Sequence, residues 1–522
     1  MIIRRHLCYN YLSLYRLIYL ILITVFLFTV YSNVYHNHYL IKDDYNLLKE
    51  VHSFPDRSFF HIDVQQGRFI NAFITNWNVY KLLDNSINGK WFRLFSLFIL
   101  SFISLLLYDK LFFSVKDSFQ RFLLPLCIIL LLPFQIIVLW VALMGSAFAI
   151  VFSILAFTLF WKFNGPNIST CFRLCVVGFL CAFLLEIIAL NMYEPFAMFF
   201  WTMPALLLIM DDQYAQNLRE WRKFLLLYAA AGFCSMLVRY LLPKIILPLL
   251  SIAPYGRTQK VISNIPELLG RLYWFIQEPF VRGLNFWNFP NFFITSLVIS
   301  IIVAGIVLEI FYLLKYKSKC LYQSLKIASE KYFTISILIL LSFSPNILVS
   351  SCEPRYRTFI AFTPILYLLF WKGCTRISRG IFNNHKYINR FILILLLVMG
   401  IHSATKNCYF VTTQNNFDRR YMESKLNTIL SEYKPEGIKQ FHIIVFGSRW
   451  KTIKHRLEFG YLTSEVGYQA VGMLCDLLHS KNIDIKKYKF SHSYNNKNLN
   501  LESGSVIIDM SSIKDYFNAN DI

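Results

Sequence analysis

Residues Arg121–Trp161 read RFLLPLCIILLLPFQIIVLWVALMGSAFAIVFSILAFTLFW, and after the first residue this stretch contains no Asp, Glu, Lys, Arg or His. It is about twice as long as the run of about 20 apolar residues that crosses the hydrocarbon core of a bilayer as a helix. Every backbone polar group must be paired inside a bilayer, so helix is the conformation that we expect here. A tight turn near Trp140–Gly145 would therefore divide the stretch into two membrane spans, 122–140 and 142–161.

The rest of the chain repeats this pattern. Hydrophobic residues make up 56% of the 522 residues and charged residues only 16%, whereas a soluble globular protein has about 25% charged residues. With the two spans above, the apolar segments predict an α-helical multi-pass membrane protein with about eleven transmembrane helices. The further segments are 12–32, 93–108, 173–190, 194–210, 224–250, 291–314, 332–350, 357–371 and 389–404.

Positive charge is concentrated between these segments. The chain has 52 Lys and Arg against 30 Asp and Glu, a net charge of +22. Much of the excess lies in short loops, where it indicates membrane topology and not nucleic-acid binding. The bias predicts a cytoplasmic N-terminus and a C-terminus on the opposite side. The 11 cysteines follow no metal or disulfide spacing, and Cys408 and Cys475 are the one pair outside the spans that we expect could meet.

This topology places three large pieces on the outer side. We expect a membrane domain, 1–404, with outer loops 33–92 and 251–290, followed by a C-terminal domain, 405–522. Gln440–Gly447 and Ser505–Met510 are typical of short buried strands, and Met422–Tyr433 and Ser464–Ser480 have helical spacing of apolar residues. The tail is therefore predicted to be a small α/β domain. Asn264–Arg282 in the middle loop predicts an amphipathic helix, which either guides a lipid tail or caps the bundle.

The first outer loop carries the acidic candidates. Asp43 and Asp44 are adjacent just beyond the first span, and mutual repulsion would raise the pKa of one of them, as suits a general base. A solvated acidic turn is the alternative. Asp63 and Gly67-Arg68 follow in the same loop, where an ordinary turn with a snorkelling arginine is the alternative.

A second group of candidates lies at the outer ends of later spans. Tyr193-Glu194-Pro195 forms a very short outer turn, and Glu353-Pro354-Arg355-Tyr356-Arg357 precedes the tenth span. The planar fork of an arginine is well suited to phosphate, so Arg355 and Arg357 are candidate phosphate ligands. Anchoring to lipid headgroups is the alternative for both.

These pieces together resemble the bacterial O-antigen glucosyltransferase family, also called glucosyl transferase II. Asp43-Asp44 and Gly67-Arg68 match its carboxylate pair after the first helix and its later Gly-Arg, although the spacing from Asp44 to Gly67 is longer than expected. The turn at Tyr193-Glu194 resembles the Tyr-Gln turn of the family, with Glu in place of Gln. Arg357-Thr358 before an apolar span resembles its Arg-Thr element.

The resemblance implies a GT-C-like enzyme of the bacterial inner membrane that transfers glucose from a polyprenyl-phosphate donor to the O-antigen of lipopolysaccharide on the periplasmic face, a serotype-converting reaction. Asp44, or failing that Asp43, would be the base. Substrate binding would fall to Arg68, Asp63, Tyr193, Glu194, Arg355 and Arg357. Membrane lipids would be further partners. No cofactor is implied and a divalent-metal requirement stays open; the chain has neither a Walker loop nor a GxGxxG fingerprint.

Two other classes compete with this interpretation. A flippase of lipid-linked sugars should have internal repeats and charges at the bilayer midplane, whereas the polar candidates here gather at the outer face. An O-antigen polymerase or a membrane acyltransferase would share the location. A polymerase should have its largest loop in the middle of the chain, whereas the large pieces here lie at the ends.

Overall fold

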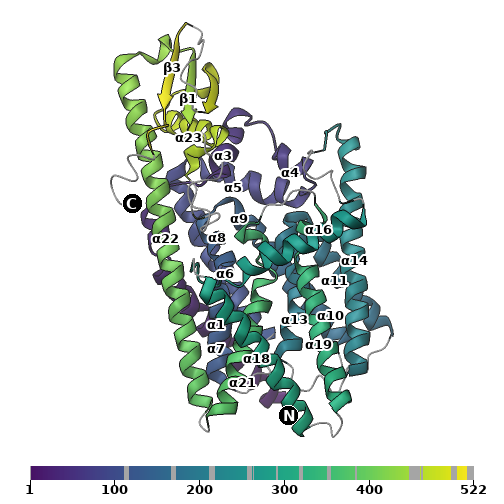
Figure 1. Cartoon of the computed structure of the whole chain (residues 1–522). Helices are drawn as coiled ribbons and strands as arrows, with labels where there is room; N and C mark the ends of the chain where they lie inside the picture. The colour runs from purple at the N-terminus through teal and green to yellow at the C-terminus, as the bar shows by residue number, and fades with distance from the viewer. Residues whose placement is uncertain are drawn as a thin grey trace.

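A computed structural model describes residues 2–110, 117–165, 172–210, 218–254, 262, 264–289, 292–316, 321–349, 354–382, 385–445, 459, 462–494 and 503–513. Helices form an elongated bundle, and a small sheet lies beyond one end of it (Figure 1). The first residues of the chain lie at the opposite end.

Each apolar segment predicted as a span contains helix, although 357–371 begins with the end of a 3-10 helix, Tyr356–Thr358, and a turn at 359–362. Six helices of the described residues are long and apolar enough to cross a membrane: Ser86–Lys110, Ala142–Asn164, Arg173–Met192, Arg219–Leu249, Phe293–Leu314 and His385–Glu432. Leu14–Val30 and Glu194–Met210 are apolar but shorter. The chain is therefore a helical membrane protein, while the count of about eleven spans stays a prediction. The helices that contain the predicted spans other than 122–140 are α1 (Ile2–Val30), α6 (Gly89–Lys110), α10 (Phe148–Asn164), α11 (Phe172–Met192), α13 (Phe199–Met210), α14 (Leu218–Leu249), α18 (Phe292–Tyr316), α19 (Leu321–Ser342), α21 (Thr363–Ile381) and α22 (His385–Glu432).

The predicted span 122–140 is not one straight helix. It consists of α7 (Ser118–Ile129) and α8 (Leu132–Leu139), which meet at an angle of 61° and count as a seventh span only if taken together. Pro133 causes the break, because proline has no N–H to donate and its ring clashes with the preceding turn. The Gln135 side chain donates to the Leu130 carbonyl at 2.7 Å and so satisfies an acceptor that the break leaves free. The predicted turn follows, between α8 and α9 (Ala142–Ser146).

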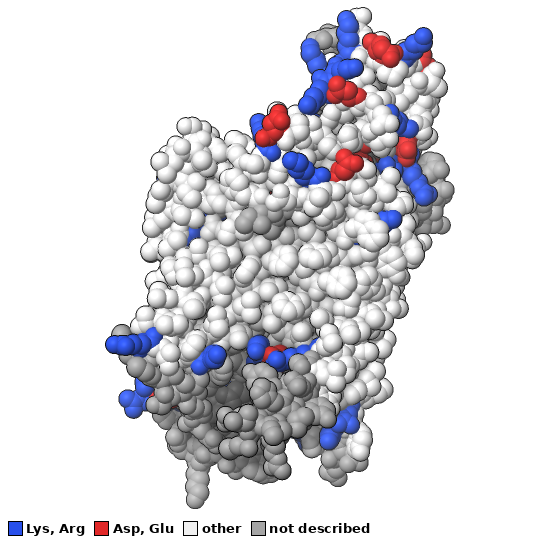
Figure 2. Space-filling view, turned by 180° about the vertical axis from the view of Figure 1, so that it is seen from behind, with Lys and Arg blue, Asp and Glu red and all other residues white. Residues whose placement is uncertain are grey.

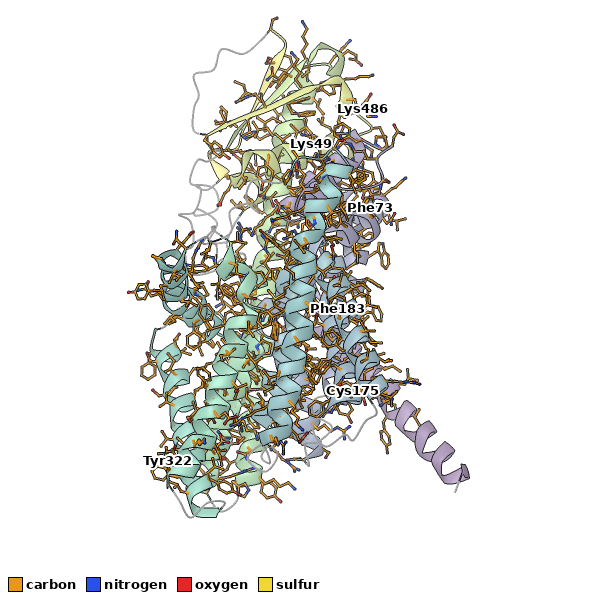
Figure 3. All side chains as sticks on the ribbon, turned by 90° about the vertical axis from the view of Figure 1, so that its right-hand side faces the viewer. Lys49, Phe73, Cys175, Phe183, Tyr322 and Lys486 are labelled. Carbon is orange, nitrogen blue, oxygen red and sulfur yellow. The ribbon has the colours of Figure 1, made fainter. Side chains whose placement is uncertain are left out.

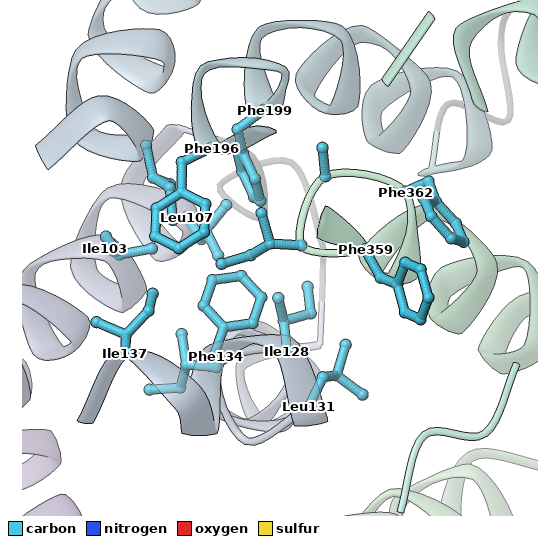
Figure 4. Packing of buried hydrophobic residues seen from close by; sticks show 14 of the residues in the cluster. Ile103, Leu107, Ile128, Leu131, Phe134, Ile137, Phe196, Phe199, Phe359 and Phe362 are labelled. Atoms are coloured by element: carbon cyan, nitrogen blue, oxygen red, sulfur yellow. The ribbon is translucent and has the colours of Figure 1, made fainter. Parts of the chain in front are cut away.

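The bundle has a dry aromatic and aliphatic core. Phe134 of α8 packs among side chains from α6, α7, α13 and the segment before α21, all almost fully buried (Figure 4). The outer faces of α11, α14 and α18 expose large apolar side chains instead, among them Leu184, Leu226 and Val303. Figure 2 shows a broad surface band with few charges between two levels where Lys and Arg gather. Such a band is the surface that a bilayer covers.

Short helices cover the end of the bundle next to the sheet. The first loop forms α2 (Asn33–His36), α3 (Asp43–Ser53), α4 (His61–Gln65), the π-helix η1 (Asn71–Asn76), α5 (Trp77–Leu83) and η2 (Ser86–Asn88). The helix predicted in the middle loop is present as α16 (Ile265–Phe275), continued by η5 (Ile276–Phe280) and α17 (Val281–Gly283). Phe275 is buried, while Leu269 and Tyr273 are exposed, so one side packs on the bundle and the other presents apolar side chains.

Beyond these helices lies a small α/β unit. Strands β1 (Gln440–Val445) and β3 (Ser505–Asp509) occur where the sequence predicts them, and β2 (Lys489–Tyr494) completes a parallel sheet in the order β2-β1-β3. The predicted helix 464–480 is α23 (Gly467–Ser480), which forms the crossover between β1 and β2. The predicted helix at 422–433 is the end of α22, which runs without interruption through the predicted domain boundary at 404/405. Cys408 and Cys475 are both free, so the disulfide considered from the sequence is not present.

Candidate active site

Several segments meet at the end of the bundle that carries the α/β unit (Figure 1). They are the first loop around α3, the α8–α9 junction at Trp140–Ala142, the short helix η6 (Tyr356–Thr358) and the N-terminal end of α23. α23 packs against α3, while η6 packs against α8 and against α12 (Glu194–Ala197). The residues that the sequence singled out lie on these segments or beside them.

Asp44 lies in the first turn of α3 and is completely buried. Its Oδ1 accepts hydrogen bonds from the Ala142 N–H, at 2.9 Å, and from the Tyr80 hydroxyl. Its Oδ2 accepts one from the Ile41 N–H at 3.2 Å. Burial raises the pKa of Asp44 to about 6, although these hydrogen bonds oppose the rise. Both oxygens therefore accept hydrogen bonds, and Oδ1 joins the first loop to the α8–α9 junction through Ala142.

Asp43 has a different environment. Its side chain is half-buried, and its Oδ1 accepts hydrogen bonds from the Gln469 amide at 2.9 Å and from the Tyr468 hydroxyl at 3.1 Å. Burial and the nearby Asp43 raise the pKa of Tyr468, with Arg355 opposing the rise, so the phenol stays protonated and remains a donor. Within the described part of the chain, Oδ2 of Asp43 accepts no hydrogen bond. One oxygen of this carboxylate is therefore held and the other is open.

Two cations lie close to the Trp140 ring. The Lys42 ammonium is 5.5 Å from the centroid of its ring, and the Arg357 guanidinium carbon is 4.7 Å from it. Both distances are within the range of cation–π attraction. Trp140 itself is 3% exposed and ends α8, so the bend of the α7–α8 pair determines where this ring stands. Lys42 immediately precedes Asp43, which brings the aromatic ring, two cations and the acidic pair into one region.

The turn that presents Lys42 and Asp43 is fixed from the C-terminal part of the chain. Lys42 has a left-handed backbone, with φ +49°, which costs a non-glycine residue about 1 kcal/mol or more. Its N–H donates to Thr463 Oγ1 at 3.0 Å, and the Thr463 hydroxyl donates to Asn415 Oδ1 of α22 at 2.8 Å. These hydrogen bonds fix the conformation of the turn at the N-terminus of α3.

Arg93 fixes the segment that leads into this turn. It is completely buried near the start of α6, where its guanidinium donates to the carbonyls of Val34, Asn37 and Tyr39 at 3.2, 3.1 and 2.6 Å. An arginine fork suits such a set of acceptors because its donors are rigidly spaced. The path of the chain from the first span to Asp43 is therefore determined by one side chain of the bundle.

Arg68 and Glu194 form a second cluster. Arg68 Nε donates to Glu194 Oε2 at 2.9 Å, and its guanidinium lies over the Tyr193 ring with the carbon 4.7 Å from the centroid. Arg239 of α14 pairs with the other oxygen of Glu194 and also donates to the Gln66 carbonyl at 2.8 Å. The glutamate, which replaces the Gln expected from the resemblance, thus joins the first loop to α12 and α14.

Gly67 is required by this contact. Its φ is +74°, and a Cβ built there would lie 2.5 Å from Pro243 and 2.6 Å from the Arg239 guanidinium. Only glycine combines that backbone conformation with such a close approach. Asp63 is 6% exposed and accepts a hydrogen bond from the Asn71 side-chain amide at 3.3 Å. It lies within electrostatic range of both Arg68 and Tyr80, and therefore between the two clusters.

A hydrogen-bond chain from the bundle fixes η6. The Tyr356 hydroxyl donates to Asn288 at 3.2 Å, Asn288 donates to Asn407 at 3.1 Å, and Asn407 donates to Gln135 of α8 at 2.9 Å. Arg355 and Arg357 flank Tyr356 in the sequence, so this series of hydrogen bonds fixes the position of the backbone that carries both arginines. Glu353, at the start of the same motif, lies outside the described residues.

The structure thus brings Asp43, Asp44, Arg355 and Arg357 to one region, with Asp63 between that region and the cluster of Arg68, Tyr193 and Glu194. The sequence did not identify Trp140, Tyr468 or Gln469 as site residues. It singled out Arg239 as an ionisable residue within a span, with pairing between helices as the alternative interpretation. Tyr468 and Gln469 gave no such signal, because they meet Asp43 across more than 400 residues of chain, a separation of 425 for Tyr468.

The arrangement offers a defined chemistry. A carboxylate with one free oxygen can accept the proton of a hydroxyl, and an arginine fork can bind an anionic leaving group. Cations can also stabilise negative charge that develops on such a group. A search of curated proteins finds no match for this chain. A family model, glucosyl transferase GtrII, matches residues 64–371.

Proposed function

The chain belongs to the glucosyl transferase GtrII family and is therefore a glycosyltransferase, and from this premise we propose its reaction. It transfers glucose from a polyprenyl-phosphate sugar to the O-antigen of lipopolysaccharide on the periplasmic face of the bacterial inner membrane. The observation that carries the proposal is the open carboxylate of Asp43 beside the cations around Trp140. No nucleotide is needed, because a lipid-linked donor brings an activated sugar with a phosphate leaving group.

Asp43 is the base in this proposal, whereas the sequence favoured Asp44 ahead of it. Asp44 is 0% exposed and both its oxygens accept hydrogen bonds, so no acceptor hydroxyl reaches it. Asp43 is half-buried, and the donors from α23 hold one oxygen while leaving the other to the substrate. Asp44 acts as a positioning residue that fixes the turn on which Asp43 stands.

The donor phosphate is bound by Arg357 and Arg355, with Lys42 beside them. Arg68 is not placed in this group, because Glu194 already engages its Nε and shares its second oxygen with Arg239. We assign Arg68, Tyr193, Glu194 and Asp63 to the wall of the acceptor or donor site, where they position the first loop. The lipid tail of the donor stays in the bilayer beside the bundle, while its phosphate lies at the level of η6.

The proposed topology follows from this orientation. About eleven helices cross the membrane in a GT-C-like arrangement, with the N-terminus in the cytoplasm. The acidic pair, the loops 33–92 and 251–290, and the α/β unit face the periplasm. The lysine- and arginine-rich short loops support this orientation.

The test is glucose transfer by the full-length protein in membranes that contain polyprenyl-phosphate glucose and O-antigen. Asp43→Asn should lower transfer by about 10²-fold or more, because the amide keeps the shape and loses basicity. The matched control is Asp56→Asn, an exposed acid of the same loop, which should keep parental transfer. Loss of transfer in Asp44→Asn with full activity in Asp43→Asn, at equal protein levels, would assign the base to Asp44 instead.

A further inference from the structure

A second cluster of chemically active side chains lies away from the proposed glycosyl-transfer site. His52 at the C-terminal end of α3, Asp84 after α5 and His479 at the end of α23 place a ligand atom each within 4.8 Å of one another. The His479 Nε2 is 3.5 Å from Asp84 Oδ1, and the His52 Nε2 is 3.9 Å from the same oxygen. The two imidazole rings are tilted by 31° relative to one another, with centroids 3.9 Å apart.

His52 is the unusual member of the three. Both of its ring nitrogens are buried, and neither makes a hydrogen bond to a described residue. A buried polar atom without a partner costs about 1–3 kcal/mol, so such atoms are rare unless something unseen satisfies them. Here the unsatisfied nitrogen atoms face a second imidazole and a carboxylate, which are the donor types that Zn²⁺ and similar transition metals bind.

The space around the cluster accommodates an ion and its water. A cavity of about 330 Å³ is lined by all three residues, together with Asp484, Lys81 and Lys486. Lys486 and Lys49 mark this end of the molecule, beside the α/β unit, in Figure 3. Metal–ligand distances of about 2.0–2.1 Å place neighbouring ligands of a tetrahedral site about 3.3 Å apart. The two Nε2–Oδ1 separations, 3.5 and 3.9 Å, exceed that value by about 0.2 and 0.6 Å, and all three ligand atoms lie within 4.8 Å of one another.

The helix framework holds the ligands together independently of any ion. α3 and α23 run side by side in the same direction, because Asp43 meets Tyr468 at one end and His52 meets His479 at the other. A Cβ at Gly472 would lie 2.7 Å from the Tyr45 carbonyl carbon, so the two helices approach to backbone contact. Asp84 has a left-handed conformation, with φ +57°, and its carboxylate lies near the Nε2 atoms of both histidines.

We propose that His52, Asp84 and His479 form a transition-metal site of the zinc class, with water or Asp484 as the fourth ligand. The ion would join the first loop to the α/β unit at the far end of the helix pair whose near end holds Asp43. The lysines that line the cavity make an inorganic anion the competing occupant. Three acceptor atoms on two imidazoles and a carboxylate favour the cation.

The experiment uses the full-length protein, purified in detergent without a histidine tag and stripped of metal with a chelator. Co²⁺ is titrated while its visible absorption reports tetrahedral coordination, and Zn²⁺ is then added in competition. We expect one site per chain in the wild type and at least about tenfold weaker binding in His52→Gln and in His479→Gln. His38→Gln changes an exposed histidine of the same loop and should bind as the wild type does.

Two outcomes overturn the proposal. One is equal Co²⁺ binding by the wild type and the double variant His52→Gln/His479→Gln, which would make the ion adventitious. The other is thermal stabilisation of the wild type by inorganic phosphate but not by Zn²⁺, which would make the cavity an anion site. Each variant is compared by size-exclusion elution, so a misfolded chain is recognised separately. Metal binding is measured without any sugar substrate, so the result is independent of the proposed glycosyl transfer.

Discussion

The substitution Gly472→Ala tests whether the close contact between α3 and α23 holds Asp43 in position. The new Cβ would lie 2.7 Å from the Tyr45 carbonyl carbon, 2.8 Å from its oxygen and 2.9 Å from the Asn46 nitrogen. All three are backbone atoms, so no side chain can rotate away, and α23 must move by several tenths of an ångström to restore ordinary contact. Inserting a methyl group into such packing costs about 1–3 kcal/mol, against a gain in helix propensity of about 1 kcal/mol.

The difference between this cost and this gain is a net loss of up to about 2 kcal/mol in the free energy of unfolding. The same displacement lengthens the hydrogen bonds from Tyr468 and Gln469 to Asp43, now 3.1 and 2.9 Å, toward the limit at which they weaken. Glucose transfer should therefore fall along with stability. Thermal unfolding in detergent, followed by tryptophan fluorescence, measures the first effect, and the membrane transfer assay measures the second.

Gly270→Ala is the matched control. Gly270 is also helical, in α16, but nothing lies within 4 Å of the position that its Cβ would take. Alanine there should stabilise the protein by about 0.5–1 kcal/mol and leave transfer unchanged. The two substitutions are chemically identical and have opposite expected signs. Equal stability and equal transfer in Gly472→Ala and the parent protein would refute the argument that this close approach holds Asp43 in place.

Three further predictions concern phosphate, pH and topology. Arg357→Lys should weaken the use of donor lipid when that lipid is titrated in the transfer assay, because lysine lacks the fork, whereas Arg379→Lys, at an exposed arginine in the last turn of α21, should not. The pKa of Asp44 is raised from 3.8 to about 6 in the folded protein. The contribution of Asp44 to the free energy of unfolding is therefore greatest below pH 3.8 and is lost as the pH rises through 6. The total loss is about 3 kcal/mol. Unfolding midpoints measured from pH 4 to 7 should therefore fall for the wild type relative to Asp44→Asn, and parallel curves would contradict this. Reporter fusions after His385 and after Glu432 should report opposite sides of the membrane, and the same side for both would overturn the proposed topology.

The helical class was predictable because burial in lipid leaves a simple pattern, long runs without charge. Each of those runs contains helix in the structure, and the β-branched segments at 440–447 and 505–510 contain strands. The strand β2 was missed, since KFSHSY is mostly polar and contains no aliphatic residue. The bend at Pro133 was also missed, because the prediction weighed apolar length and ignored the missing N–H of proline.

The site was predictable as a set of candidates and not as an arrangement. The adjacent acids were visible in the sequence, but their different burial is decided by Ala142 and Tyr80 on one side and by α23 on the other. Local spacing cannot show contacts between residues hundreds of positions apart. For the same reason, a search for metal-binding spacing among the eleven cysteines did not find the proposed metal ligands. Those ligands are two histidines and an aspartate that come together only in the folded protein, at the C-terminal end of α3.

The contact between Asp43 and α23 also bears on the order in which the molecule is completed during synthesis. Asp43 is made early, but the tyrosine that donates to it is made 425 residues later. At about 5–20 residues per second, the acid waits roughly 20–85 s for this partner. In the proposed orientation, that partner must also cross the membrane, following α22, before the two can meet. The chain therefore inserts its bundle before the proposed catalytic turn is complete, and we expect activity only when the last part of the polypeptide has folded against the first.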